Sequence, residues 1–200
     1  MRLFGFSPTR SDRAAWALDE LGITYEAVSE KVFQHPELEK FHPLRRIPAL
    51  DVEGQGLFES AAICNYLADQ YPERELIAKP GTWERAYHDQ WTFFALTEME
   101  AWAWSSFRSA NVLPKEEEVP EMYAHNKNAY RISATALESA LSKADYLIDN
   151  KFTMADIVVS WTCQFGEDLG YNDGFDHIQA YIDRMRQRPH CPFKSKPVTA

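Results

Sequence analysis

Residues 45–50 read R-R-I-P-A-L, and the proline stands where a buried strand is expected to begin. Because proline has no backbone N–H to donate, it is confined to the first residue, the edge or a bulge of a strand. Two arrangements fit. Pro48 is an ordinary first residue, or the Ile47–Pro48 bond is cis, which marks a specific tight turn. A cis turn would direct the backbone of Ile47 away from the sheet, where an extended peptide can pair with it as an added strand.

Short strand-like and helical stretches alternate around this proline through the first 75 residues. The expected strands are 2–6, 24–28, 48–52 and 57–59, and the expected helices are 11 or 12 to 21, 36–41 and 60–71. The first strand-helix-strand unit predicts a parallel crossover, and the closely spaced last pair of strands predicts an antiparallel hairpin.

No further strand is expected beyond a polar linker at 76–82. A helix packed against another helix is predicted over 123–146, because apolar residues recur there at steps of four and three: Tyr130, Ala134, Leu137, Leu141 and Ala144. Other helices are expected over 82–110, 153–169 and 176–188. The chain is therefore predicted to contain an α/β domain at 1–75 and an all-helical domain at 83–200.

Composition narrows the class of protein. The 200 residues carry a formal net charge of −9, which argues against nucleic acid or an anionic membrane as the main partner. The three cysteines, Cys64, Cys163 and Cys191, are widely spaced and predict neither a disulfide framework nor a metal site. The N-terminus has no signal-peptide pattern, and no apolar run is long enough to span a membrane, so the cytoplasm is the expected location.

The stretch L-F-E-S-A-A-I at 57–63 lies where a strand ends and a helix begins. One interpretation is structural, with Ser60 as the helix cap or a first-turn residue. The other is an anion site, because a helix N-terminus offers free N–H groups to a carboxylate. Glu59 beside it would then face an ammonium group, and the pair would suit an α-amino acid head group.

The stretch F-S-P-T-R-S-D-R at 6–13 joins a strand to a helix through a turn rich in hydroxyls. Ser11 or Asp12 can cap that helix, and Thr9 can complete the turn. A functional interpretation is that one hydroxyl donates a hydrogen bond to a thiolate and so lowers the thiol pKa.

Aromatic residues are dense on the long helix after the linker: Trp91, Phe93, Phe94, Trp102, Trp104 and Phe107. They form either core and interdomain packing or an aromatic acceptor pocket. We expect them to divide between these two roles, whereas Trp16 on the first helix is expected to pack in the core.

Four stretches in this order resemble the glutathione transferase superfamily over essentially the whole chain. They are S-P-T-R-S-D-R-A-A-W-A-L-D-E-L-G-I-T-Y-E at 7–26, F-H-P-L-R-R-I-P-A-L at 41–50, F-E-S-A-A-I-C-N-Y-L-A at 58–68 and F-T-M-A-D-I at 152–157. The last also has a physical reading as a capping box of Thr153 and Asp156. The resemblance implies a thioredoxin-like N-terminal domain, an all-α C-terminal domain and a homodimer, with a serine- or threonine-like active-site turn.

The resemblance also implies a glutathione site. Ile47 would pair its backbone with the cysteinyl part of glutathione, with Pro48 cis, while Glu59 and Ser60 hold the γ-glutamyl group. Arg46 would meet the glycyl carboxylate. The catalytic hydroxyl would be Thr9, with Ser7 and Ser11 as competitors on the same turn.

Two departures from the family pattern stand close to R-I-P. Arg45 adds charge and bulk where the family has glycine, and His42 replaces asparagine. We expect His42 to be a structural hydrogen-bonding residue.

The resulting functional hypothesis is a glutathione transferase that joins the glutathione thiolate to a small hydrophobic electrophile, with glutathione as substrate and no metal. A glutathione-dependent isomerase is a neighbouring reading. The alternative from another class is a non-catalytic binding or regulatory protein of the stringent-starvation type.

Overall fold

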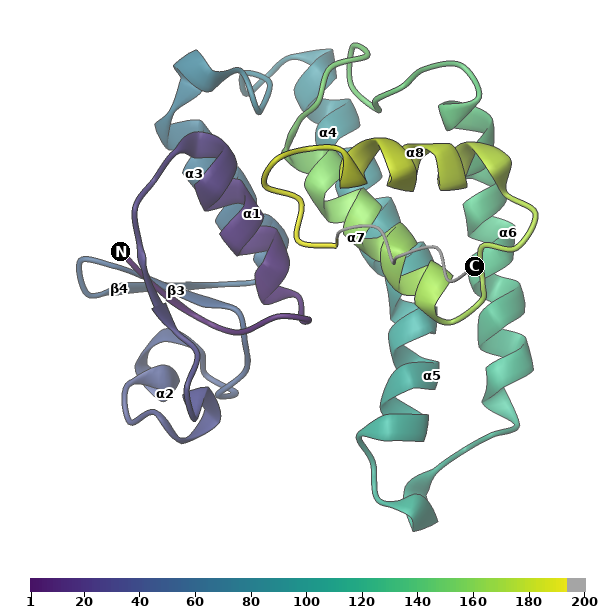
Figure 1. Ribbon diagram of the computed structural model, residues 1–200, viewed down its shortest axis with the longest axis horizontal. Helices are drawn as coiled ribbons and strands as arrows, with labels where there is room; N and C mark the ends of the chain where they lie inside the picture. Colours follow the sequence, from purple (N-terminus) through teal and green to yellow (C-terminus); the bar gives the residue numbers. More distant parts are fainter. Residues whose placement is uncertain (194–200) are drawn as a thin grey trace.

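The computed structural model describes residues 1–193 of the chain, which form a mixed α/β part followed by an all-helical part (Figure 1). The first part contains β1 (Arg2–Phe4), α1 (Ser11–Leu21), β2 (Glu26–Val28), η1 (Val32–Gln34), α2 (Leu38–Phe41), β3 (Ala49–Val52), β4 (Gln55–Phe58), α3 (Ser60–Gln70) and η2 (Pro72–Arg74). The second contains α4 (Trp83–Phe94), the π-helical turn η3 (Ala95–Glu100), α5 (Ala101–Asn111), η4 (Lys115–Glu117), α6 (Met122–Leu141), α7 (Met154–Asp168) and α8 (Asp176–Arg186). The predicted fold class is confirmed.

The four strands form one sheet in the order β2-β1-β3-β4. β1 pairs in parallel with β2 and antiparallel with β3, and β3 forms an antiparallel hairpin with β4. The predicted crossover and hairpin are therefore both present. Phe4, Ala49 and Phe58 are register partners across the three neighbouring strands, so one edge of the sheet carries the end of β1, the start of β3 and the end of β4.

Helix α1 forms where the apolar spacing predicts it. Ala14, Leu18 and Leu21 are buried, and Gly22 ends the helix at φ 71°, in the left-handed region that glycine adopts without a steric penalty. The helix starts at Ser11, one of the two expected positions, but neither Ser11 nor Asp12 caps it, because Arg10 is the N-cap.

Gly5 permits the close approach of α1 to β1. A Cβ atom at Gly5 would lie 2.1 Å from the Ser11 hydroxyl oxygen, so any side chain there would displace Ser11. Ser11 is buried against β1, and Arg10 before it takes the N-cap position.

Several expected boundaries are wrong by a few residues. The turn between β3 and β4 is two residues long, because Glu53 and Gly54 both take positive φ and Asp51 accepts a hydrogen bond from the Gly54 N–H. The expected helix over 82–110 is divided by the π-helical turn. The helix expected over 123–146 ends at Leu141, and its last carbonyls are met by a turn at Ser142 and Lys143.

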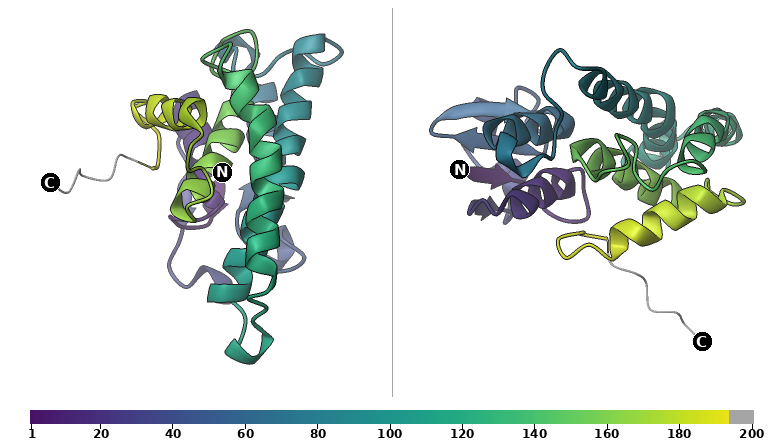
Figure 2. Two further views of the ribbon diagram at one scale, coloured as in Figure 1. Left: turned by 90° about the vertical axis from the view of Figure 1, so that its right-hand side faces the viewer. Right: turned by 90° about the horizontal axis from the view of Figure 1, so that it is seen from above.

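The hydrophobic core continues from one part into the other. Helices α1 and α3 cover one face of the sheet, α2 covers the other, and α7 packs against α1 and α3 (Figure 2). Trp16 is almost fully buried in the shared core, as expected, together with Met99 of the π-helical turn and Ile157 of α7. This packing fixes the position of α1 against the helical part.

The predicted capping box at the start of α7 is confirmed. Asp156 Oδ2 accepts hydrogen bonds from the Thr153 backbone N–H at 2.8 Å and from its hydroxyl at 3.0 Å. Asp156 Oδ1 accepts a further hydrogen bond from the Tyr181 hydroxyl at 2.9 Å, which ties α7 to α8.

We expect Thr153→Ala to lower the free energy of unfolding by about 1–2 kcal/mol, because an N-cap hydroxyl is lost at a buried helix start. Denaturant unfolding measures the change. Thr135→Ala removes the same atoms from an exposed position inside α6 and is expected to change stability by less than about 0.5 kcal/mol. Equal effects of the two substitutions would contradict the capping role.

Candidate functional site

Most of the residues singled out in the sequence meet at one edge of the sheet. The register of Phe4, Ala49 and Phe58 brings the turn at 5–10, the Ile47–Pro48 pair and the Glu59–Ser60 pair to the same edge. The Ile47–Pro48 peptide bond is cis, and the Ser7–Pro8 bond, which the sequence did not single out, is cis as well.

The start of α3 combines a buried hydroxyl with an exposed carboxylate. Ser60 is the first helical residue and is 4% exposed, and its hydroxyl oxygen accepts a hydrogen bond from Arg13 Nη1 at 3.2 Å. Glu59 is the N-cap with φ 70°, an uncommon value for a residue other than glycine, and its side chain is exposed and does not cap the helix. Backbone strain of this kind costs about 1–3 kcal/mol and gathers at ligand-binding positions.

His42 is a structural residue, as expected. Its Nδ1 accepts a hydrogen bond from the Leu44 N–H at 3.1 Å, and its ring packs on Phe58 with centroids 4.8 Å apart. Burial lowers the pKa of His42, and the nearby charges of Glu59 and Arg46 act on it in opposite directions. The charges of Glu59 and the exposed Arg46 therefore both lie within electrostatic reach of His42.

The Arg45 side chain is held by the segment before α2. Its guanidinium donates hydrogen bonds to the carbonyl oxygens of Phe33 at 2.9 Å and His35 at 3.2 Å. The arginine is thus bound to the turn before α2, and its backbone takes φ 50° to reach it.

The hydroxyl turn is the segment 6–11 between β1 and α1, and its three hydroxyls, those of Ser7, Thr9 and Ser11, have different environments. The Thr9 hydroxyl donates to the Phe6 carbonyl oxygen and accepts from the Ser11 N–H at 3.2 Å. Ser11 is 2% exposed, and its hydroxyl has no partner within residues 1–193. Ser7 is exposed and lies close enough to the carboxylate of Asp12 to act on its pKa, which burial raises and Ser7 lowers.

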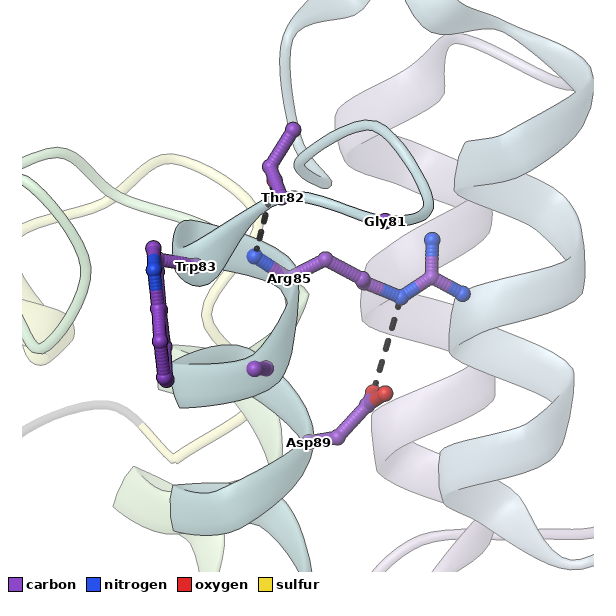
Figure 3. Close-up of a pocket in the computed structure, with 6 residues that line it drawn as sticks. Gly81, Thr82, Trp83, Arg85 and Asp89 are labelled. Carbon is purple, nitrogen blue, oxygen red and sulfur yellow. Dashed lines mark hydrogen bonds and ion pairs between the residues drawn. The ribbon is translucent and has the colours of Figure 1, made fainter.

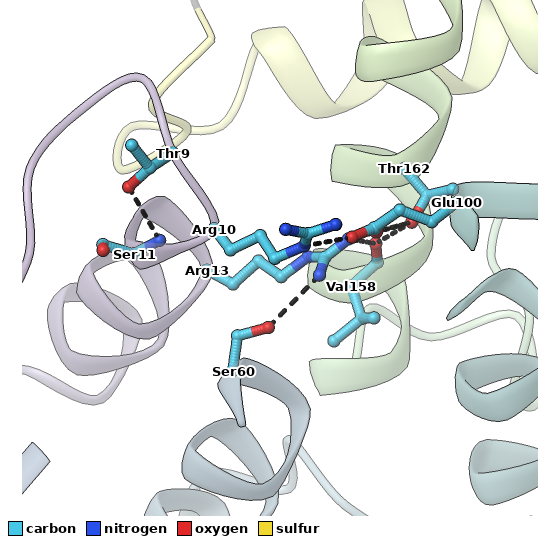
Figure 4. A network of polar contacts seen from close by, with 8 residues as sticks. All are labelled: Thr9, Arg10, Ser11, Arg13, Ser60, Glu100, Val158 and Thr162. Atoms are coloured by element: carbon cyan, nitrogen blue, oxygen red, sulfur yellow. Dashed lines mark hydrogen bonds and ion pairs between the residues drawn. The ribbon is translucent and has the colours of Figure 1, made fainter. Parts of the chain in front are cut away.

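A buried ion network lies behind this edge and joins α1 to the helical part (Figure 4). Arg13, fully buried, pairs with Glu100, which is 2% exposed, and its Nη2 also donates to Thr162 Oγ1 at 2.9 Å. Thr162 in turn donates to Glu100 at 2.8 Å, and Arg10 pairs with the other carboxylate oxygen. Burial alone would raise the pKa of Glu100, but the two guanidinium groups outweigh it and lower the pKa to about 2.

Neither Arg13 nor Glu100 was recognised from the sequence as part of the site. A weak signal exists, because Arg13 precedes Ala14 at the start of the buried helix face and Glu100 lies among apolar and aromatic residues. A charge in such a position needs an opposite charge, but the sequence does not show which one it meets.

Of the aromatic residues on the long helix, Trp91, Phe94 and Trp102 pack against the core, as part of the prediction required, and the other three lie on two surfaces. Trp104 and Phe107 stack with centroids 5.7 Å apart, and Phe165 and Trp161 of α7 continue the row. The Trp161 side chain also lies close enough to Asp12 to lower its pKa, so this row borders the turn that carries Ser7, Thr9 and Ser11. Phe93, by contrast, is 62% exposed on α4. Trp161 and Phe165 were missed because their helix carries no local excess of aromatic residues.

A hollow of about 390 Å³ opens at the start of α4 (Figure 3). It is lined by Gly81, Thr82, Trp83, Arg85, Ala86 and Asp89. Because Arg85 also pairs with Asp69 near the end of α3, the hollow lies at the opposite end of that helix from Ser60 and does not belong to the candidate site.

Residues 1–193 contain no group of three or more histidine, cysteine, aspartate or glutamate side chains that could hold a metal ion. No helix in that range is long and apolar enough to cross a membrane.

Comparisons with known proteins agree with this geometry. The family model of the glutathione S-transferase N-terminal domain matches residues 1–69, and that of the C-terminal domain matches 91–189. A sphingomonad glutathione S-transferase solved in complex with glutathione is 26% identical, with a TM-score of 0.83 over 96% of this chain and 95% of that chain.

Curated relatives of similar identity carry different names. Protein LigF of Sphingobium sp. strain SYK-6 is 27% identical over 237 residues, covering 94% of this chain and 90% of that protein. Elongation factor 1-gamma of Prunus avium is 27% identical over 178 residues, covering 85% of this chain but 39% of that longer protein.

Proposed function

The chain belongs to the glutathione S-transferase family, and from that premise we propose that it binds glutathione at the sheet edge and transfers its thiolate to a small hydrophobic electrophile. The observation that carries the proposal is the start of α3, where Ser60 is backed by the buried guanidinium of Arg13. A positive charge, a hydroxyl and free helix N–H groups together favour a carboxylate.

The proposed binding mode assigns each part of glutathione to one group. The γ-glutamyl carboxylate meets Ser60 and the first N–H groups of α3, and the γ-glutamyl ammonium meets the exposed carboxylate of Glu59. The backbone of Ile47, before Pro48, pairs with the cysteinyl unit, and Arg46 meets the glycyl carboxylate. Thr9, Ser7 and Ser11 stay the candidates for the hydroxyl that contacts the sulfur, and the buried Ser11 is the least accessible of them.

The electrophile would lie against the row formed by Trp104, Phe107, Phe165 and Trp161. This row offers partly exposed apolar area beside the hydroxyl turn, which suits a small hydrophobic acceptor. Holding thiolate and acceptor in contact would supply most of the rate enhancement through proximity.

We also propose that two copies of the chain associate in the cytoplasm. The support for a homodimer is the set of exposed aromatic residues on α4, Trp83, Tyr87 and Phe93, whose apolar area a second copy could cover. The domain limits 1–75 and 83–200, with the linker 76–82, belong to the same proposal.

Calorimetric titration with glutathione, followed by a panel of electrophiles, tests the function. We expect binding at or below millimolar concentration and formation of thioether products with at least one acceptor. Turnover in which glutathione is regenerated would instead indicate an isomerase. Absence of glutathione binding at millimolar concentration would reject the proposed function.

A non-catalytic binding or regulatory role is the second candidate. It is favoured by the match to elongation factor 1-gamma at an identity similar to that of LigF. Glutathione binding without product formation from any electrophile would support this role over the transferase.

A further inference from the structure

The hydroxyl turn also contains a positively charged residue, Arg10, which the sequence analysis did not consider. Arg10 lies between Thr9 and Ser11 and is the N-cap of α1. Thr9 already donates its proton to the Phe6 carbonyl oxygen, and Ser7 lies beside the Asp12 carboxylate. Ser11 is buried against Gly5. Each hydroxyl must therefore break a contact or move before it can donate to a ligand.

Arg10 is held in place by only part of its guanidinium group. Its Nε bonds to Glu100, and its central carbon lies 4.3 Å from the centre of the Trp104 ring. Within residues 1–193, its two terminal nitrogens make no hydrogen bond. The side chain is 31% exposed, and Figure 4 shows the Arg10 guanidinium group beside Glu100. Arg10 thus presents fixed, unused N–H donors beside the turn.

The charges around Arg10 leave it able to attract an anion. Arg10 and Arg13 carry two positive charges against the one negative charge of Glu100. Asp12 on the same helix is the other carboxylate at the turn; burial raises its pKa, while the Ser7 and Trp161 side chains, the Thr9 backbone and the Arg13 charge act to lower it. The positive end of the α1 dipole adds to the attraction, because Arg10 precedes the first helical residue.

We propose that Arg10 is a catalytic residue whose guanidinium group binds the sulfur of glutathione as the thiolate. This inference rests on the proposed glutathione site, which lies at the same sheet edge as the turn. A neighbouring arginine and a helix N-terminus are the two features that most lower a thiol pKa in proteins. The thiol proton leaves to solvent, a sulfur lone pair forms the S–C bond, and the leaving group departs with its bonding electrons.

The acidity of the bound thiol distinguishes Arg10 from the hydroxyls. The ultraviolet absorbance of the thiolate is titrated against pH in the glutathione complexes of the unaltered protein, Arg10→Gln, Arg10→Lys, Thr9→Val and Ser7→Ala. We expect Arg10→Gln to raise the thiol pKa by about one to two units, and Arg10→Lys by less because the charge is kept. Thr9→Val and Ser7→Ala are expected to shift it by less than about half a unit.

Turnover should follow the same order. At neutral pH, kcat/KM of Arg10→Gln is expected to fall about 10- to 100-fold, and the deficit should shrink as pH rises above the shifted pKa because the thiolate then forms without assistance. Arg74→Gln removes the same charge from an exposed site beside Gly22, at the far end of α1, and is expected to change neither quantity.

Three outcomes would overturn the assignment. The first is a folded Arg10→Gln variant that binds glutathione with an unchanged thiol pKa. The second is a thiol pKa that shifts more in Thr9→Val or Ser7→Ala than in Arg10→Gln. If Arg10→Gln does not fold, Arg10→Lys takes its place in this comparison. The third is a change confined to the KM of anionic acceptors, which would place Arg10 at the acceptor. Failure of the unaltered protein to bind glutathione would instead reject the proposed function.

Discussion

Glu100→Gln is expected to lower the free energy of unfolding at pH 7 by about 3–5 kcal/mol. Glu100 is the shared partner of Arg13 and Arg10, and Arg13 is fully buried. The amide keeps the shape of the side chain but leaves the Arg13 charge without an opposite charge in a site that water does not reach. Breaking a buried pair from one side is costly for this reason, even where the pair itself adds little stability.

The loss should depend on pH in a defined direction. The folded-state pKa of Glu100 is about 2, below the ordinary value of 4.5, so its ionised form stabilises the fold. That contribution, about 3 kcal/mol for a difference of this size, is fully present above about pH 4.5 and is lost as pH falls toward 2. The stability difference between the unaltered protein and Glu100→Gln should therefore be constant from pH 7 to 5 and shrink below that.

Urea unfolding of both proteins across this pH range measures the difference. Glu117→Gln provides the matched control, because Glu117 is exposed in η4 and its loss of charge should change stability by less than about 0.5 kcal/mol. A loss below 1 kcal/mol at pH 7, or a difference that grows as pH falls, would contradict the buried network.

The sequence was sufficient for the fold because its local signals agree with one another. The apolar period of α1, Gly22 at its end and the capping box at Thr153 each specify a local structure that the whole fold keeps. Boundaries were less predictable where tertiary contacts decide them. Ser11 or Asp12 was expected to cap α1, but Arg10 is the N-cap and Ser11 packs against Gly5. The π-helical turn at 95–100 has no comparable sequence signal.

The candidate site was predictable in its backbone and less so in its charges. The backbone of the site comes from two local stretches, R-I-P-A-L and F-E-S-A-A-I. Once the β3–β4 hairpin is recognised, its register places Ala49 opposite Phe58 and so brings the two stretches together. The partners of Arg13 are at 60, 100, 158 and 162, and no periodicity relates those positions. The same limit applies to the turn, where the sequence shows three hydroxyls but not that the Thr9 hydroxyl is already hydrogen-bonded and the Ser11 hydroxyl is buried.

Ser60→Ala and Glu59→Gln are each expected to weaken glutathione binding about 10- to 100-fold, because each removes one hydrogen bond to a charged group of the ligand. Ser60→Ala removes the hydroxyl proposed to meet the γ-glutamyl carboxylate, and it also leaves Arg13 Nη1 without its acceptor. Glu59→Gln keeps the side-chain shape but removes the charge that faces the γ-glutamyl ammonium. Calorimetric titration of each folded variant measures the dissociation constant.

A glutathione analogue that lacks the γ-glutamyl amino group separates the two contacts. If Glu59 binds the ammonium, the analogue should bind the unaltered protein about as weakly as glutathione binds Glu59→Gln. The affinity for the analogue should then be the same in Glu59→Gln as in the unaltered protein. Ser60→Ala should weaken both ligands by the same factor, because both keep the carboxylate. If Glu59→Gln instead weakens the binding of both ligands by the same factor, the carboxylate does not act through the ammonium. It then acts through the strained backbone at the start of α3, because the φ of 70° at Glu59 is common to both complexes.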